Sequence, residues 1–232
     1  MLEIHAGERR LPLALAPDAA RELRRASAPL SRGERAHLAW RLRSAPWRRV
    51  LSELGRDGAV LDVGCGPGLL AHLLSRAGFA GRYTGVDPDP RKVDRARRWL
   101  REDENRLFVA GSVESAPPGA FTQVALIDVL YLVPPAGRTG FVERAVGALA
   151  PGGRFVALTS GGGARWKRIL DSVQERLAVG LGITRGGAVA ICDGAEIATL
   201  LRNAGLEDVA VADIGAGYVH GFELVTGRRP AA

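Results

Sequence analysis

The chain has 232 residues, 47% of them hydrophobic, and carries a formal net charge of +7 at pH 7. This composition predicts one large globular domain with an appendage, and no apolar run reaches the roughly 18 residues that a membrane-spanning helix needs. The N-terminal stretch does not resemble a secretory signal, and the spacing of the two cysteines, Cys65 and Cys192, argues against a disulfide framework or a zinc site, so we expect a cytoplasmic protein.

Residues 1–54 are predicted to form an N-terminal helical cap, because residues 17–54 show helical periodicity before the first strand-like run. Residues 1–56 hold 12 Arg against 6 acids, so this quarter carries most of the net charge. The charge indicates either solvated helix faces or a contact surface for an anionic partner. The general bias toward Arg, 30 against 2 Lys, favours the first interpretation.

Strand-like and helix-like runs then alternate, which is typical of a parallel sheet covered on both faces. The strands are expected at 59–63, 82–87, 106–110, 123–130 and 154–159. Helices are expected near 68–77, 89–103 and 135–150, and the last of these is predicted to stop at "APGG", because glycine ends helices and proline prevents their continuation.

The C-terminal third contains an insertion and then a hairpin. Residues 160–192 begin with the glycines of "SGGGARW" and are predicted to form a mobile lid inside a domain that spans 55–227. A helix near 194–204 follows, and the short link between the runs 207–214 and 218–227 predicts an antiparallel hairpin. Residues 228–232 are a tail.

A glycine-rich turn follows the first strand, in the stretch "AVLDVGCGPGLLAHLL" at residues 59–74. Asp62, Gly64, Gly66 and Gly68 form the pattern D-x-G-x-G-x-G between a strand and a helix. Glycines there permit a tight turn and allow a ligand to touch the backbone, and the helix start attracts an anionic group. The glycines alone are also compatible with a purely structural turn.

A second acidic position makes the ligand interpretation stronger. The next predicted strand ends at Asp87, 19 residues after Gly68, where an acid binds the ribose hydroxyls in nucleotide-binding folds. The glycine spacing differs from G-x-G-x-x-G and no phosphate-binding G-x-x-x-x-G-K-[ST] occurs. The sequence therefore predicts a nucleoside site without a pyrophosphate or triphosphate.

Over residues 45–227 the chain resembles the class I S-adenosylmethionine-dependent methyltransferases. "VLDVGCGPGLLAHLL", "GVDPDP", "VAGSVES", "VALIDVLYLVP" and "LAPGGRFVALTS" match their five motifs in order. The resemblance implies an α/β, Rossmann-like doubly wound fold with a mostly parallel seven-stranded sheet, and S-adenosylmethionine as cofactor without a metal. It assigns cofactor contacts to Asp62 (amino group), Gly64, Cys65, Gly66, Gly68, Asp87 (ribose), Pro88, Gly111, Ser112 and Val113 (adenine), and Asp128 (methionine moiety and acceptor).

Some positions depart from the pattern of the family. Ser112 stands where many relatives carry an acid that recognises the adenine amino group. Thr122 replaces the Asp that commonly precedes the fourth strand. Tyr131 and Leu132 stand where many small-molecule relatives have two histidines, which excludes a catalytic His there.

Methyl transfer from a sulfonium depends chiefly on alignment, but a hydroxyl acceptor also benefits from a general base. His220 is the candidate base and Tyr131 the candidate acceptor-facing group, with packing or capping roles as the alternatives. His37 could also face the acceptor, whereas His5 lies in the terminus and His72 is interpreted as structural. Trp40, Trp47 and Trp166 either line an acceptor pocket or pack in the core, Trp99 is interpreted as structural, and Cys65 as an unreactive neighbour of the cofactor.

We therefore expect a bacterial enzyme that methylates a small natural-product or lipid-related acceptor, with O-methylation favoured. Peripheral membrane contact is compatible with the basic cap. A nucleic-acid methyltransferase is the second hypothesis, although the chain has no Pro-Cys nucleophile and no [DN]-P-P-[YFW] at the fourth strand. A cofactor-binding partner without activity is the third.

Overall fold

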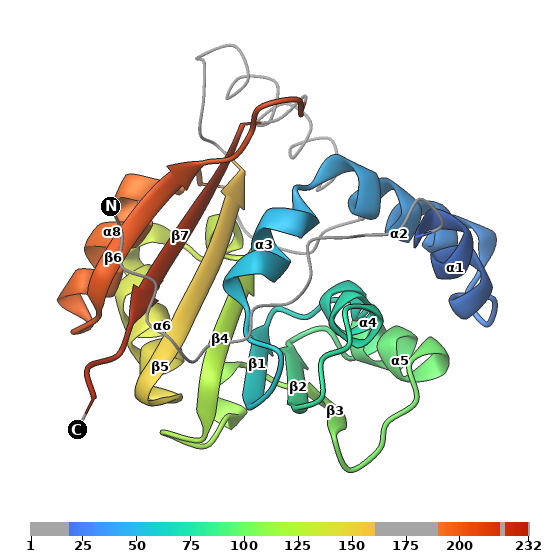
Figure 1. Cartoon of the computed structure of the whole chain (residues 1–232), viewed down its shortest axis with the longest axis horizontal. Helices are drawn as coiled ribbons and strands as arrows, with labels where there is room; N and C mark the ends of the chain where they lie inside the picture. The colour runs from blue at the N-terminus through green and yellow to red at the C-terminus, as the bar shows by residue number, and fades with distance from the viewer. Residues whose placement is uncertain (1–18, 161–189, 219–220, 232) are drawn as a thin grey trace.

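A computed structural model describes residues 19–160, 190–218 and 221–231 of the chain. Its centre is a seven-stranded sheet with the order β3-β2-β1-β4-β5-β7-β6 (Figure 1). The first five strands pair in parallel, and β7 is antiparallel to both of its neighbours. The strands are β1 (Ala59–Val63), β2 (Arg82–Asp87), β3 (Arg106–Ala110), β4 (Phe121–Ile127), β5 (Leu149–Ser160), β6 (Glu207–Asp213) and β7 (Phe222–Arg228). The predicted fold class and the C-terminal antiparallel hairpin are thereby confirmed.

Helices cover both faces of the sheet because its strands are apolar on both sides. Val60 packs in one core cluster, whereas its neighbours Leu61 and Val63 pack in the other, as the alternation of side chains along a strand requires. The first cluster holds residues of α1 (Ala19–Ala26), α2 (Arg32–Ser44), α3 (Trp47–Glu53), α4 (Leu69–Arg76) and α5 (Pro90–Trp99). The second holds residues of α6 (Pro135–Gly147) and α8 (Gly194–Asn203).

The bounds of the first three strands agree with the sequence prediction, but the fourth strand is shorter at its end. β4 stops at Ile127 instead of residue 130, because Asp128 adopts a left-handed backbone with φ 56°. A short 3-10 helix, η2 (Leu130–Leu132), follows directly. Asp128 therefore lies at the carboxyl end of β4 and outside its ladder.

The prediction that "APGG" ends a helix is wrong. α6 already ends at Gly147, and Leu149 pairs with Phe121 as the first residue of β5. The strand pairing shifts register before Gln123 pairs with Arg154, so residues 150–153 form an irregularity within β5. Helix α5 is also shorter than predicted: it ends at Trp99 instead of residue 103.

Helices α1, α2 and α3 lie in the predicted cap. Ser31 and Glu34 form a capping box at the start of α2, in which each side chain accepts a hydrogen bond from the other residue's backbone N–H. Ala45 and Pro46 separate α2 from α3. Because Leu38 and Trp47 are buried in the core cluster that also holds strand residues, the cap is packed into the domain.

The predicted lid, residues 160–192, lies mostly outside the described residues. Its last residues return to the sheet, where Thr159 Oγ1 donates a 2.6 Å hydrogen bond to the carbonyl of Cys192. β7 includes Arg228, so the predicted tail begins one residue later than expected. In the described ranges, every helix is too short or too polar to cross a membrane.

Candidate functional site

The glycine-rich turn after β1 folds over the end of β2. The N–H groups of Gly64 and Cys65 both donate to the carbonyl of Val86, at 2.8 and 3.0 Å. The next amide, that of Gly66, donates to Oδ2 of Asp87 at 2.9 Å. These bonds join the carboxyl ends of two neighbouring parallel strands, which is where open α/β sheets bind their ligands.

The three glycines of this turn all have positive φ, but they are needed for different reasons. A Cβ on Gly64 would lie 2.5 Å from Cγ2 of Val129, and one on Gly68 would lie 2.7 Å from Cδ1 of Leu100. Packing within the protein therefore accounts for both of these glycines. A Cβ on Gly66 would meet nothing within 4 Å, so this residue faces open space at the edge of the sheet.

Asp87 connects this turn to the start of α5. Its carboxylate is only 3% exposed, and its Oδ1 accepts a 2.9 Å hydrogen bond from the amide of Asp89. Nζ of Lys92 lies 3.9 Å from its Oδ2. The carbonyl of Asp87 also accepts the N–H of Gly111 at 3.1 Å, so the end of β3 lies beside it.

The residues predicted to surround the adenine follow at that point. Val113 is buried, whereas Ser112 and Pro88 are exposed. The hydroxyl of Ser112 donates to the side chain of Glu114. The carboxylate of Glu114 therefore lies beside Ser112, the position at which many relatives carry an acid.

Asp62 lies in β1 with its side chain buried beside the turn. Its Oδ2 accepts a 2.6 Å hydrogen bond from the hydroxyl of Tyr83 in β2. Burial raises the pKa of the Asp62 carboxyl to about 7, and the nearby charge of Asp87 adds to this, although the Tyr83 bond acts in the opposite direction. Burial also raises the pKa of the Cys65 thiol far above its usual value, which fits an unreactive side chain.

Asp128 is paired with a residue that the sequence did not point to. Nη2 of Arg41, in the cap helix α2, donates to Oδ2 of Asp128 at 2.6 Å across 87 residues of sequence. The side chain of Asp128 is 4% exposed and that of Arg41 is 25% exposed. Oδ1 of Asp128 is buried and has no hydrogen-bond partner among the described residues.

Tyr131 lies in η2, three residues after Asp128, and is half-buried. Its carbonyl accepts the N–H of Ala190 at 3.3 Å, so the end of the insertion lies beside it. Arg41, the partner of Asp128, also lies near Tyr131. His220, the candidate base, lies outside the described residues, as do His5 and Trp166.

The remaining candidate aromatic residues divide into buried and exposed ones. His72 is buried against Trp99, and burial lowers its pKa to about 4, as expected for a structural histidine. Trp47 is buried and donates to the carbonyl of Arg41 at 2.9 Å. Trp40 is 45% exposed and is therefore not a core residue, and its ring lies 6.1 Å from that of His37.

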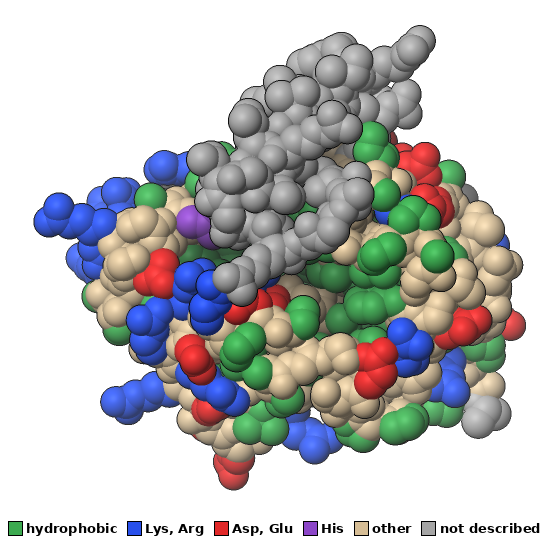
Figure 2. Space-filling view, turned by 180° about the vertical axis from the view of Figure 1, so that it is seen from behind, with side chains coloured by type: hydrophobic (Ala, Val, Ile, Leu, Met, Phe, Trp, Pro, Cys, Tyr) green, Lys and Arg blue, Asp and Glu red, His purple; other side chains and the backbone are tan. Residues whose placement is uncertain are grey.

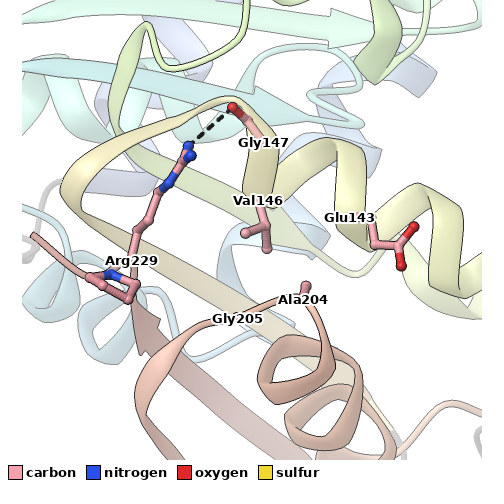
Figure 3. A pocket seen from close by; sticks show the side chains of 7 residues that line it. Glu143, Val146, Gly147, Ala204, Gly205 and Arg229 are labelled. Atoms are coloured by element: carbon pink, nitrogen blue, oxygen red, sulfur yellow. Dashed lines mark hydrogen bonds between the residues drawn. The ribbon is translucent and has the colours of Figure 1, made fainter. Parts of the chain in front are cut away.

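A cavity of about 370 Å³ lies away from this site (Figure 3). It lies between the C-terminal ends of α6 and α8 and the segment after β7, at the amino ends of the parallel strands. Arg229 closes one side with a 3.3 Å hydrogen bond to the carbonyl of Gly147. The cavity is lined by Glu143, Val146, Gly147, Ala204, Gly205, Arg229 and Pro230. None of the sequence-predicted site residues lines it.

Comparisons with known proteins find similarity to methyltransferases. The profile of a family described as "Methyltransferase domain" matches residues 60–153. The trans-aconitate 2-methyltransferase of Rhodopseudomonas palustris is 32% identical over 113 residues, which are 48% of this chain and 43% of that protein. The ubiquinone biosynthesis O-methyltransferase of Methylocella silvestris is 37% identical over 102 residues, 43% of this chain and 39% of that protein. The similar segments thus span less than half of either relative.

Solved structures share the fold at lower identity. A putative methyltransferase of Haloferax volcanii, in complex with the Trm112 methyltransferase activator, superposes with a TM-score of 0.67 at 17% identity, covering 94% of this chain and 99% of that chain. The 1,6-didemethyltoxoflavin-N1-methyltransferase of Burkholderia thailandensis, with bound S-adenosylhomocysteine, gives 0.61 at 22% identity, covering 97% and 94%. Residues 60–153 thus match the methyltransferase-domain family, and the chain as described shares the fold of solved S-adenosylmethionine-dependent methyltransferases.

Proposed function

We propose that this chain transfers the methyl group of S-adenosylmethionine to a small-molecule acceptor, with a hydroxyl acceptor favoured. The observation that carries the proposal is the open space at Gly66, with the carboxylates of Asp62, Asp87 and Asp128 at the ends of three adjacent strands. Similarity to a trans-aconitate 2-methyltransferase and to a ubiquinone biosynthesis O-methyltransferase supports a small-molecule acceptor.

The described residues fit this cofactor at both of its ends. The buried carboxylate of Asp87 would bind the ribose, and the open space at Gly66 would receive the nucleoside. The methionine end of the cofactor carries an ammonium and a carboxylate. The resemblance assigns the ammonium to Asp62, and Oδ1 of Asp128, an acceptor without a partner in the described part of the chain, would accept another of its N–H groups. The cationic guanidinium of Arg41 is complementary to the carboxylate.

The chain's own residues would act mainly by alignment. When bound, the cofactor supplies a methyl group on a positively charged sulfur, which is already a good leaving group. Arg41 and Asp128 would hold one end of the cofactor and Asp87 the other, which fixes the direction in which the acceptor must approach. Alignment of two reactants can lower a barrier by about 7–11 kcal/mol.

The proposed contacts with the acceptor rest on fewer hydrogen bonds than the proposed contacts with the cofactor. Tyr131, on the loop after Asp128, would orient the acceptor, and His220 would accept the proton of a hydroxyl acceptor. If no residue of the chain accepts this proton, alignment of the two reactants remains the source of the rate enhancement. This would suit an acceptor that is already deprotonated or that loses its proton to water.

Two experiments test the proposed function in sequence. Titration calorimetry with S-adenosylhomocysteine tests cofactor binding, for which we expect micromolar affinity without added metal. Turnover with radiolabelled S-adenosylmethionine against a bacterial metabolite extract then tests for catalysis and identifies the acceptor. Binding without any labelled product in that screen would favour a non-catalytic partner.

A nucleic-acid acceptor is the alternative that the charge distribution favours. Figure 2 shows basic side chains gathered at the end of the molecule that holds α1, α2 and α5. Several of these cations pair with acids of the same chain, however: Arg95 and Arg98 with Glu34, at 2.7 and 3.1 Å. We therefore expect only weak RNA binding that is lost at physiological salt. Tight binding at that salt would favour the nucleic-acid function instead.

A further inference from the structure

Trp99 lies directly beneath the glycine-rich turn. It is the last residue of α5, is 8% exposed, and its indole Nε1 donates a 2.8 Å hydrogen bond to the carbonyl of Pro67. Pro67 lies between Gly66 and Gly68, so this bond attaches to the centre of the turn. It joins two segments that are 32 residues apart in sequence.

Neighbouring contacts hold the turn from the same side. The ring of His72, in the first turns of α4, lies 5.1 Å from that of Trp99. Leu100 fills the space beneath Gly68, where even a Cβ would lie 2.7 Å from its Cδ1. The segment from Pro67 to His72 is thus packed on the C-terminal end of α5.

The N-terminal end of the same helix is connected to the other half of the site. Asp89 is the N-cap of α5, and its own amide donates to Oδ1 of Asp87 at 2.9 Å. Helix α5 therefore contacts Asp87 with one end and the glycine-rich turn with the other. A rigid element that supports two parts of a ligand site maintains their spacing before the ligand arrives.

We propose that Trp99 is a positioning residue for the cofactor: its indole N–H holds the glycine-rich turn in the conformation that binds S-adenosylhomocysteine. This inference rests on the proposed cofactor. The alternative is that Trp99 only packs in the core. In that case the loss of its hydrogen bond would lower stability without changing the affinity of the folded protein.

The variant Trp99→Phe separates these two roles, because it keeps an aromatic ring against His72 and removes the N–H group. The matched control is Thr122→Val, which removes the 2.9 Å bond between Thr122 Oγ1 and the amide of Ala59 at the opposite end of β1. Both variants lose hydrogen bonds to the backbone, but only one of these bonds lies under the turn. Calorimetry gives the dissociation constant of S-adenosylhomocysteine for each folded variant.

We expect Trp99→Phe to bind about fivefold more weakly than Thr122→Val, the change that corresponds to one neutral hydrogen bond. Amide hydrogen exchange of Gly64, Cys65, Gly66 and Gly68 in the ligand-free protein should also be faster in Trp99→Phe than in the control. Equal affinities in the two variants, or equal exchange of the turn, would overturn the proposal.

A measurement on the unmodified chain covers the case in which Trp99→Phe does not fold. If the indole bond favours the binding conformation, linkage requires that bound S-adenosylhomocysteine slow the exchange of the Trp99 indole N–H, which NMR detects. Unchanged indole exchange at saturating ligand contradicts the proposal. Absence of binding to the unmodified chain would instead refute the cofactor itself, and the exchange of the ligand-free turn would still test the role of Trp99.

Discussion

Replacement of Gly66 by alanine tests whether the open space beside the turn belongs to the ligand. Gly66 has φ 54°, a left-handed conformation that costs a non-glycine residue about 1–2 kcal/mol. No atom lies within 4 Å of the added methyl group, so we expect no further loss of stability. For a domain of this size the melting temperature should fall by about 2–8 °C.

The effect on binding should exceed the effect on stability. If the cofactor occupies the space that the methyl group would fill, the overlap costs about 1–3 kcal/mol, which corresponds to a 5- to 150-fold weaker affinity for S-adenosylhomocysteine. Calorimetry at a temperature well below the melting transition measures this loss on the folded protein.

Gly152→Ala is the matched control for this experiment. Gly152 also has a positive φ, 73°, and also has nothing within 4 Å of an added Cβ, but it lies in the irregular part of β5 near the amino ends of the strands. It should lose the same stability and keep full affinity. An unchanged affinity in Gly66→Ala would show that the ligand does not use the space beside Gly66, and our placement of the cofactor would be wrong.

Three further predictions concern charged groups of the site. Asp87→Ala should weaken S-adenosylhomocysteine binding by about 10- to 150-fold in calorimetry, because a charge-assisted hydrogen bond is lost, and an unchanged affinity would remove the ribose assignment. Burial raises the pKa of the Asp62 carboxyl from its usual 3.8 to about 7, so its contribution to stability is fully present below about pH 4 and is lost as the pH rises to 7. Near pH 6 this carboxyl is mostly protonated, and the ammonium of the bound ligand favours its ionised form, so ligand binding should release up to about one proton. Calorimetry in buffers of different ionisation enthalpy measures this release, which should be absent from Asp62→Asn. Arg41→Met should lower the free energy of unfolding by about 3–5 kcal/mol in urea titrations, because it leaves the buried Asp128 carboxylate without its partner. The double variant with Asp128→Asn should recover part of the loss, because Asn is uncharged and tolerates the left-handed backbone at this position; equal losses in both would contradict this account of the pair.

The elements to which we assign the cofactor could be predicted from sequence because their signals are local. Strands β1, β2 and β3 are short segments bounded by polar or glycine residues, and their predicted bounds agree with the structure. Asp62 and Asp87 lie near the carboxyl ends of β1 and β2, and Gly66 follows β1. The expectation that they gather at one edge depends only on the parallel direction of the strands.

The parts that sequence did not reveal depend on tertiary contacts. Arg41 is one of 12 arginines in residues 1–56, and nothing in its neighbourhood marks it as the partner of Asp128, 87 residues away. The left-handed backbone at Asp128 ends β4 within an apolar run that reads as continuous strand. Gly152 and Gly153 have the pattern of a helix end, but Leu149 and Arg154 on either side of them pair with β4, so the two glycines lie in the irregular part of β5.

The place of β7 in the sheet has a consequence for how the chain folds during synthesis. β7 is the last strand in sequence but lies between β5 and β6, so it is an interior strand. Until residue 228 has left the ribosome, the outer edge of β5 exposes unpaired N–H and C=O groups, and β6 has no neighbour in the sheet. Open edges of this kind promote pairing between chains. Slow completion of this C-terminal segment would therefore expose the nascent protein to aggregation, even though the cofactor loops had already been synthesised.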